Sequence, residues 1–409
     1  AEPIPQRMNS IGITSMRDAA FIGTFMPMYD KIVQSDKQSL RITLSQFYNP
    51  LEFEDADGKV DWDKISMQAA AVKQHYAPYA NIRADSMKIF MDGVTEGNPL
   101  ADPPALPNAA KITPYKQPIF SFDSELEKLH INGYVDPQSD ACKDDKSDNI
   151  AFKSKYGFYP EQCVVSNGVL ESPRDIEMEF IRRFDAEGYM LHMHAIGDRA
   201  VRTALDALEN ARSLNGPSDR PHALAHIQFV HPDDINRIGA LKLYLAYTYA
   251  WITTTSEYDL SVMPFIDEIK DANDLYREEY SSYIQAYPVK STMDAGAILI
   301  AGSDAPVETR DPRPFLNMQQ AVTRAGTSGQ PFNPAERINI LDVIDAYTIN
   351  GAKAMDQDEI TGSIVSGKHA DFIILDQNII TLAKDAPTTI GDTKVKSTWF
   401  DGIMVYENK

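Results

Sequence analysis

The chain has 409 residues, of which 43% are hydrophobic, and 59 aspartates and glutamates outnumber 39 lysines and arginines to give a formal net charge of -20. A chain of this length can bury a large core, either in one big barrel domain or in two smaller domains. The acidic balance argues against nucleic acid or an anionic membrane as a partner, because both repel a polyanion. No stretch approaches the roughly 20 apolar residues that cross a bilayer.

The first part of the chain alternates between strand and helix patterns. Residues 12–18 indicate a strand running into a helix, residues 41–48 alternate as in a sheet, and residues 62–79 have helical spacing. Residues 86–93 form a third strand, with Lys88 near its middle. An ammonium inside an apolar strand is costly unless it is paired or modified, so the local sequence alone favours a lysine that reaches out to solvent.

Residues 97–167 interrupt this alternation with a long segment rich in proline and aspartate. We expect an insertion or a lid, because loops of this length are usually functional. It holds both cysteines of the chain, Cys142 and Cys163, and no nearby histidine completes a zinc site with them. The alternatives are two unrelated thiols or a disulfide; we favour the disulfide, which would stabilise the loop by about 3 kcal/mol. A disulfide implies an oxidising compartment. It therefore favours a periplasmic or other extracytoplasmic location over a cytoplasmic one.

The most informative stretch covers residues 189–200. Apolar residues lead into His192 and His194, and a helical pattern begins near Asp198, which is placed to cap that helix. A histidine that ends a parallel strand faces the edge of the sheet where α/β folds keep their active sites. For one histidine alone, a buried residue satisfied by a neighbour is the better interpretation.

Further strands also end in polar residues. Residues 222–228 form a strand with His226 towards its end, and residues 243–249 form another. The clearest buried strand is at residues 297–304, a continuous apolar run that ends in the carboxylate of Asp304.

The remaining segments complete the predicted organisation. The aromatic and polar residues 250–290 predict a second lid, and helical patterns follow at residues 314–325 and 340–354. Short β segments punctuated by glycines then indicate part of a small β-sandwich. We therefore divide the chain into a barrel at residues 1–355 and a small domain at residues 356–409.

The order of these elements predicts the fold class. The seven strands begin near residues 12, 41, 86, 190, 222, 243 and 297. Most lead towards helical patterns, as in parallel β/α units. A closed (β/α)8 TIM barrel has eight such units, so the pattern lacks one.

Several motifs together resemble the amidohydrolase superfamily. They are His194 in His-Ala-Ile-Gly-Asp-Arg-Ala, His226 in Ala-His-Ile-Gln and Asp304 in Ala-Gly-Ser-Asp-Ala-Pro. Supporting matches are Gly12-Ile-Thr-Ser-Met-Arg-Asp18, Lys88-Ile-Phe-Met-Asp-Gly93 and Thr398-Trp-Phe-Asp-Gly402. More narrowly, the chain resembles amidohydrolase family 3, the YtcJ-like branch that includes N-substituted formamide deformylases. The resemblance implies a distorted TIM-like barrel, a small β-sandwich and a metal-dependent hydrolase.

The resemblance also implies a set of site residues. His194 and His226 would bind metal, Asp304 would be both ligand and general base, and Lys88 stands where related enzymes carry a carboxylated lysine. Such ligands suit a divalent ion, most simply Zn²⁺, which lowers the pKa of its bound water to about 7 and polarises a carbonyl. The implied reaction is hydrolysis of an amide or other C–N bond in a small organic substrate.

Three aromatic residues are candidates for the walls of the substrate pocket: Tyr247, Tyr249 and Trp251.

One departure from the family qualifies this expectation. The family's first strand carries a His-x-His pair, and this chain begins after that point; the pair His192 and His194 belongs to a later strand. His192 could act as a substitute ligand, but we favour a residue packed behind the ligands. We expect an open seam with unpaired strand edges, which another chain, as in a homo-oligomer, a swapped segment or an unusual closure would cover. We also expect weakened binding at the more buried metal position. The alternative function is a catalytically impaired or non-enzymatic binding or regulatory protein on this scaffold.

Overall fold

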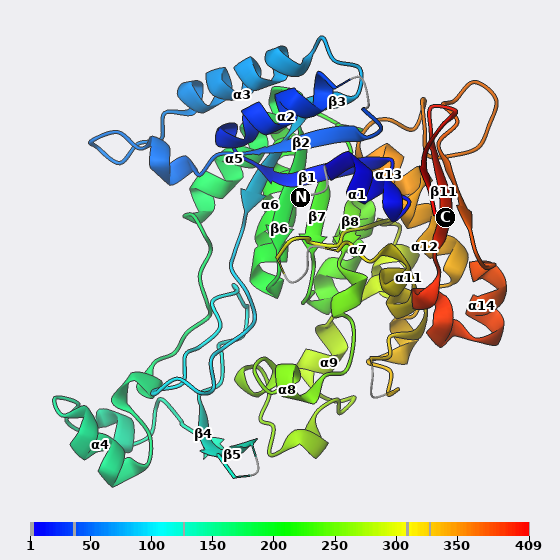
Figure 1. Ribbon diagram of the computed structural model, residues 1–409. Coiled ribbons are helices and arrows are strands. Elements are labelled where there is room, and N and C mark those ends of the chain that lie inside the picture. The colour runs from blue at the N-terminus through cyan, green and yellow to red at the C-terminus, as the bar shows by residue number, and fades with distance from the viewer. Residues whose placement is uncertain (1–3, 36–37, 126, 308–310, 327–328, 409) are drawn as a thin grey trace.

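The computed structural model describes residues 4–35, 38–125, 127–307, 311–326 and 329–408, and its centre is one curled sheet of seven parallel strands (Figure 1). The strands follow in the order β1 (Ser15–Phe21), β2 (Arg41–Phe47), β3 (Ile82–Phe90), β6 (Met190–Ala195), β7 (Ala223–His226), β8 (Tyr244–Tyr247) and β9 (Ile298–Ala301). Among the described residues β1 and β9 are the two edges, and no ladder joins them. The predicted α/β class, the seven strands and the open seam of a distorted barrel are confirmed.

The two faces of the sheet differ because successive side chains on a strand point to opposite sides. Large apolar residues such as Met87, Ile89 and Leu191 enter the main hydrophobic core on the helix side. The opposite, concave face carries small and polar residues, among them Ala223 and His192. This alternation leaves room for a site inside the curve of the sheet.

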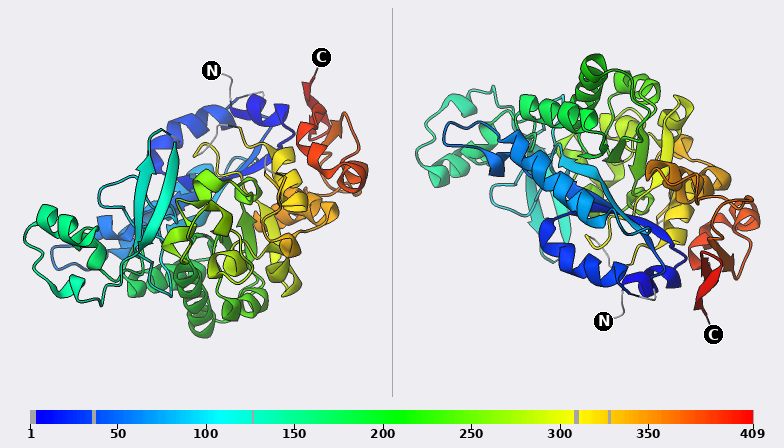
Figure 2. Two further views of the ribbon diagram at one scale, coloured as in Figure 1. Left: turned by 90° about the horizontal axis from the view of Figure 1, so that it is seen from below. Right: turned by 90° about the horizontal axis from the view of Figure 1, so that it is seen from above.

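Helices cover the convex face of the sheet, as the two views of Figure 2 show. They are α2 (Met26–Val33), α3 (Trp62–Tyr76), α5 (Arg174–Ala186), α6 (Asp198–Asn215), α7 (Ile235–Ala240), α10 (Val289–Asp294), α11 (Pro314–Thr323), α12 (Ile340–Tyr347) and α13 (Ile349–Ala354). The single helix predicted at residues 340–354 is wrong, because the chain breaks at Thr348 into α12 and α13. Within the described residues, none of the helices combines the length and apolar character needed to cross a bilayer.

The N-terminus of α6 also differs from the prediction. Gly197 is the N-cap, and Asp198 makes no capping hydrogen bond. Its carboxylate instead accepts the backbone N–H of Ile112, at 2.8 Å. A Cβ at Gly197 would lie 2.1 Å from the carbonyl oxygen of Ala110, so only glycine admits this close approach. The start of α6 is therefore built to hold the insertion.

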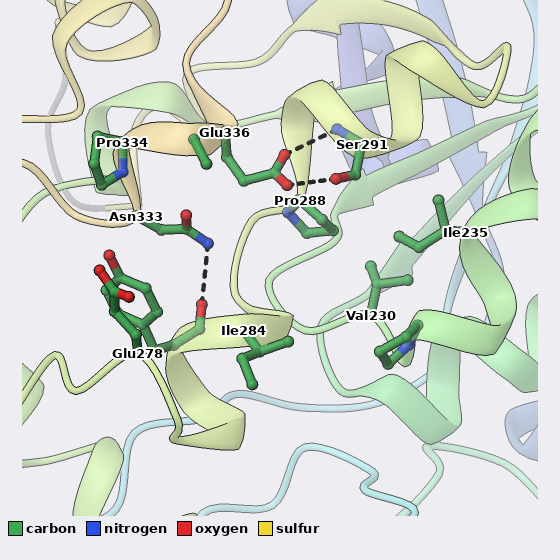
Figure 3. A pocket seen from close by; sticks show the side chains of 12 residues that line it. Val230, Ile235, Glu278, Ile284, Pro288, Ser291, Asn333, Pro334 and Glu336 are labelled. Carbon is green, nitrogen blue, oxygen red and sulfur yellow. Dashed lines mark hydrogen bonds between the residues drawn. The ribbon is translucent and has the colours of Figure 1, made fainter.

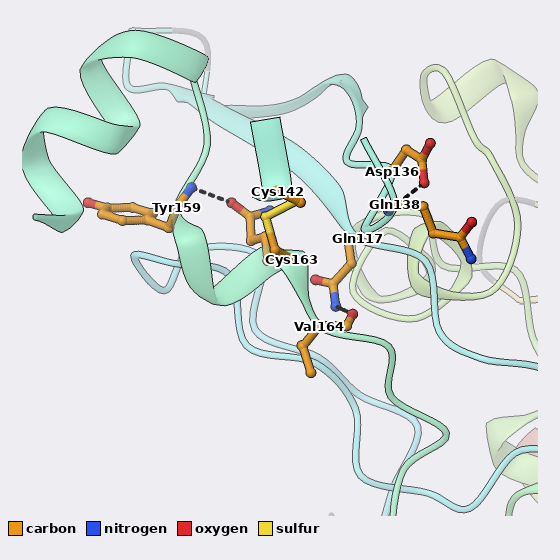
Figure 4. The surroundings of a disulfide bond; sticks show 8 residues. Gln117, Asp136, Gln138, Cys142, Tyr159, Cys163 and Val164 are labelled. Carbon is orange, nitrogen blue, oxygen red and sulfur yellow. Dashed lines mark hydrogen bonds between the residues drawn. A yellow bond between two sulfur atoms is a disulfide. The ribbon is translucent and has the colours of Figure 1, made fainter. Parts of the chain in front are cut away.

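The insertion at residues 97–167 projects away from the sheet (Figures 1 and 2). It contains the hairpin of β4 (Pro118–Asp123) and β5 (Lys128–Tyr134) and helix α4 (Asn149–Tyr156). A disulfide joins Cys142 to Cys163 and packs with a small apolar cluster around it (Figure 4).

Part of the insertion contacts the second predicted lid. That lid, at residues 250–290, holds α8 (Ser256–Asp259) and α9 (Ser281–Gln285). The hydroxyl of Tyr134 donates to the carbonyl oxygens of Asp267 and Ile269, at 3.1 and 3.0 Å. The two segments therefore support each other.

The end of the chain forms a small antiparallel sheet of β10 (Phe372–Leu375), β11 (Val395–Phe400) and β12 (Ile403–Glu407), with α14 (Ile379–Asp385) beside it. Helix α1 (Ile4–Ser10) packs against this sheet, where Thr398 donates to the carbonyl oxygen of Asn9. A buried ion pair between Arg41 and Asp371 links the start of β2 to the same region. The short β segments predicted for residues 356–409 correspond to β10, β11 and β12.

Candidate active site

Adjacent strands bring the predicted residues together at the carboxyl edge of the sheet. Lys88 lies opposite His192 and Phe90 lies opposite His194 in the ladder between β3 and β6. The rings of His194 and His226 are 4.8 Å apart between centroids. Asp304 follows β9 and is close enough to Lys88 for their charges to interact. All four residues named from the sequence therefore lie close together at this edge.

His194 is held by the carbonyl oxygen of Gly93, which lies 3.0 Å from its Nε2. Because a carbonyl only accepts, Nε2 carries the proton and donates it, and Nδ1 keeps its lone pair. Burial, assisted by the charge of Lys88, lowers the pKa of His194 to about 4. The imidazole is therefore neutral near pH 7 and has a nitrogen able to bind a metal.

His226 ends β7 and has an unsatisfied nitrogen. Its Nδ1 is buried and has no hydrogen-bond partner among the described residues, and burial lowers its pKa well below the usual value. Its ring stacks on Trp251, with centroids 5.2 Å apart and planes 12° apart. The backbone at His226 has φ 73° and that at Ile227 has φ 46°, a conformation that is strained for a β-branched residue. Such strain and an unpartnered polar atom are typical of a functional site.

Lys88 points into the site. It is 2% exposed, and its Nζ lies 4.4 Å from the centre of the Phe90 ring. Burial lowers the pKa of Lys88 to about 7, although the carboxylate of Asp304 opposes this shift. The local interpretation of a lysine that reaches solvent is therefore wrong.

Asp304 lies near Lys88, after the end of β9. It is half-buried, and burial raises the pKa of its carboxyl while the charge of Lys88 opposes the rise. Its backbone has φ 53°, a left-handed conformation that aspartate tolerates better than most residues.

Two of these side chains suit a metal ion. The neutral imidazoles of His194 and His226 are adjacent, and the unpartnered Nδ1 of His226 is a suitable ligand atom. In the part of the chain that the structure describes, no three side chains of His, Cys, Asp and Glu are close enough to hold an ion. The histidine pair thus fits part of a metal site, and a complete ligand set needs Lys88 or Asp304 to join it.

His192 is engaged elsewhere. Its Nδ1 lies 3.1 Å from Nη1 of Arg17, and because a guanidinium only donates, Nδ1 of His192 accepts. Arg17 also donates to the carbonyl oxygen of Ala354, beyond the seam. The lone pair of His192 is therefore occupied, which fits a residue packed behind the ligands.

Comparison with known proteins decides the family. The sequence model of the amidohydrolase family matches residues 158–406, more than half of the chain. The chain belongs to the amidohydrolase family.

Individual relatives agree with this assignment. The chain is 32% identical over 227 residues to Protein LONG AFTER FAR-RED 3 of Arabidopsis thaliana, covering 54% of this chain and 36% of that protein. It is 26% identical over 224 residues to an N-substituted formamide deformylase of Arthrobacter pascens, covering 54% and 37%. The matched region thus spans little more than a third of these two relatives.

A solved structure shares the fold. An uncharacterized metal-dependent hydrolase from Pyrococcus horikoshii superposes with a TM-score of 0.56 at 17% identity, covering 91% of this chain and 57% of that one. At this identity the likeness shows the architecture alone.

The predicted pocket walls of this amidohydrolase divide into two groups. Tyr247 and Tyr249 are fully buried in the main core, and the hydroxyl of Tyr247 lies 3.2 Å from that of Thr292. Trp251 is half-buried and stacks on His226. Of the three candidates, Trp251 alone lies beside the histidine pair.

Asp92 is a site residue that the sequence analysis missed. Its buried carboxylate accepts the backbone N–H groups of Ile196, Gly197 and Ala110 at 2.8 to 3.0 Å. It therefore ties together the ends of β3 and β6 and the insertion. A signal was present in the sequence, because Asp92 follows Lys88 and Phe90 at every second position, although β3 itself ends at Phe90.

A separate hollow of about 430 Å³ lies near α9 and α10 (Figure 3). Its walls include Val230, Ile284 and Pro288, and Glu336 accepts hydrogen bonds there from Ser291. None of the residues predicted for the active site lines it.

Proposed function

We propose that this chain is a metal-dependent hydrolase that cleaves an amide or other C–N bond in a small organic substrate, with Zn²⁺ as the ion. The observation that carries the proposal is the pair of adjacent imidazoles, His194 and His226, one of which has a buried nitrogen without a partner. The family membership and the deformylase among the relatives support the same class of reaction.

The chain's own residues would divide the work. His194 and His226 would supply nitrogen ligands. When bound, a divalent ion supplies a water whose pKa is lowered to about 7 and polarises the scissile carbonyl. The Oδ atoms of Asp304 would complete the ligand set, accept a proton at the site and return it to the leaving amine.

Lys88 would take part as a carbamate. A buried ammonium is costly, and Nζ of Lys88 has a ring contact but no hydrogen bond among the described residues. Addition of the free amine to CO₂ forms an N–C bond and releases one proton. The resulting anion would offer oxygen ligands where a cation stood before.

The first test is the metal content of the chain, purified without chelator and measured by elemental mass spectrometry. We expect the wild type to hold about one divalent ion per chain, or more. We expect His194→Ala and Asp304→Asn to lose the ion. His231→Ala is the matched control, since this half-exposed histidine lies in a turn outside the site and should leave the metal content unchanged. No ion after incubation with zinc or manganese, or equal content in all variants, contradicts the proposal.

We also propose an extracytoplasmic location, which rests on the disulfide between Cys142 and Cys163. Thiol alkylation of the protein taken directly from its host should leave both cysteines unlabelled before reduction. Labelling of both would contradict it.

A further inference from the structure

Five rings form a continuous arc across the carboxyl edge of the sheet. The ring arc consists of Phe47, Phe90, His194, His226 and Trp251. The first four lie in β2, β3, β6 and β7, and Trp251 ends the short turn at residues 249–251 after β8. Neighbouring centroids lie 5.1, 5.1, 4.8 and 5.2 Å apart in that order. These spacings are those of mutually contacting aromatic rings.

The two phenyl rings and the indole ring of the arc are not fully buried. Phe47, Phe90 and Trp251 are all half-buried, and Phe47 and Phe90 belong to none of the clusters of buried hydrophobic residues. They flank the histidine pair on both sides, with Phe47 and Phe90 on one side and Trp251 on the other. Partly exposed apolar rings beside polar ligands are typical of a pocket that binds an apolar group.

The rings of Phe47, Phe90 and Trp251 offer apolar faces and edges, and each ring is partly exposed. One side of the Phe90 ring is covered by the Nζ of Lys88. The arc therefore favours a ligand with a planar apolar part.

We propose that Phe47, Phe90 and Trp251 form an aromatic-binding subsite, and that the substrate is a carboxamide whose nitrogen or acyl carbon carries an aromatic ring. This inference rests on the proposed hydrolase function, because it places the amide group at His194 and His226. The aromatic ring of the substrate would lie against the flanking rings in offset or edge-to-face contact.

The test compares two matched amides by calorimetry, acetanilide and N-methylacetamide, which differ in a phenyl against a methyl group on nitrogen. We expect acetanilide to bind wild-type protein at least about tenfold more tightly, and Phe90→Leu or Phe47→Leu to weaken it by about three- to tenfold. Phe90→Tyr retains a ring and should keep most of the affinity. Phe372→Leu is the matched control, because Phe372 stacks on Trp399 in the C-terminal sheet.

Tryptophan fluorescence locates the binding site independently. The chain has three tryptophans, and acetanilide should change the emission of wild type and of Trp399→Phe but not that of Trp251→Phe. Equal affinity of the wild type for the two amides overturns the proposal. So does a change in the emission of Trp251→Phe on adding acetanilide that is as large as the change in the wild type. Thermal melts of each variant identify any that fail to fold, and the wild-type comparison stands without them.

Failure of this inference and failure of the proposed function are distinguishable. Tight acetanilide binding by a chain that takes up no metal would contradict the hydrolase and leave the aromatic subsite. A metal-bearing chain that binds and hydrolyses both amides equally well would contradict the subsite and leave the hydrolase.

Discussion

Glu177 lies fully inside the molecule on α5 with half of its carboxylate unsatisfied. Oε1 accepts the backbone N–H of Ser172 at 3.4 Å, and Oε2 has no partner among the described residues. Burial raises the pKa of this carboxyl to about 9. The folded chain therefore keeps a proton on Glu177 that the unfolded chain releases above its ordinary pKa of 4.5.

Replacement of Glu177 by glutamine should change how stability depends on pH. In the wild type this residue lowers the free energy of unfolding progressively as pH rises from 4.5 towards 9. The neutral amide removes that loss, so Glu177→Gln should be more stable than wild type at pH 9 by about 2 kcal/mol and nearly equal to it at pH 5. Urea unfolding across this range measures the difference, with the exposed Glu52→Gln as control. A difference independent of pH would show that Glu177 is ionised in the fold.

At this scale the sequence predicted some site residues and missed others. His226 and Asp304, which the structure brings near Lys88 and His194, could be named from the sequence because each ends an apolar strand. Phe90 could have been found from its alternation with Lys88, but Phe47 joins them only through the register between β2 and β3, where it lies opposite Lys88. Register depends on the tertiary packing of both strands, which no local pattern contains.

At the scale of elements, the side chain of Asp92 connects the end of β3 to the end of β6 and to the insertion. No helix or strand pattern in the sequence predicts that these segments meet. One carboxylate oxygen accepts from Ile196 and the other from both Gly197 and Ala110. An asparagine would turn an NH₂ group towards N–H donors and leave at least one of them unpaired in a buried place.

Asp92→Asn should therefore lower the free energy of unfolding by about 3 kcal/mol. Hydrogen exchange should show the amides of Ala110 and Gly197 losing protection first, while those of β8 and β9 keep theirs. The exposed Asp219→Asn is the matched control. Unchanged exchange at Ala110 would mean that the insertion is held by other contacts.

The disulfide acts on a different element. Cys142 and Cys163 are 21 residues apart in sequence and pack with Phe152 and Phe158 at the end of the insertion. Replacing both cysteines by serine should destabilise this end by about 3 kcal/mol. Limited proteolysis should then cut within residues 135–165 while the seven-stranded sheet stays intact. Cooperative loss of the whole fold would show that the insertion is not an independent unit.

Helices and strands were predictable where burial of one face gives the sequence a regular spacing of apolar residues. They were not predictable where both faces are exposed. The long apolar runs of β6 and β9 were recognisable. Strand β5 alternates only between exposed and half-exposed residues, so the sequence gives little sign of the β4–β5 hairpin. The break at Thr348 lies between two well-patterned helices, where the side-chain pattern continues although the backbone turns.

For the whole molecule, the curl of the sheet and the open seam between β1 and β9 follow from the strand count, which the sequence contains. The partners across the seam do not, because Arg17 reaches His192 and Ala354 over long sequence separations. A guanidinium that bridges strand β1 and the end of α13 is visible only once the chain is folded.

The net charge of -20 makes a prediction about the molecule as a whole. Many ion pairs among the described residues join exposed side chains and contribute little individually. We therefore expect mutual repulsion of carboxylates to be the dominant surface electrostatic effect at pH 8. Raising KCl from 20 to 500 mM shortens the Debye length from roughly 20 Å to about 4 Å and should raise Tm by a few degrees. Near pH 5, close to the sequence pI of 4.8, the same salt should have a smaller or opposite effect, since attraction is then screened as well. Differential scanning calorimetry measures both series, and a fall in Tm with salt at pH 8 would mean that attractive ion-pair networks outweigh the excess of negative charge.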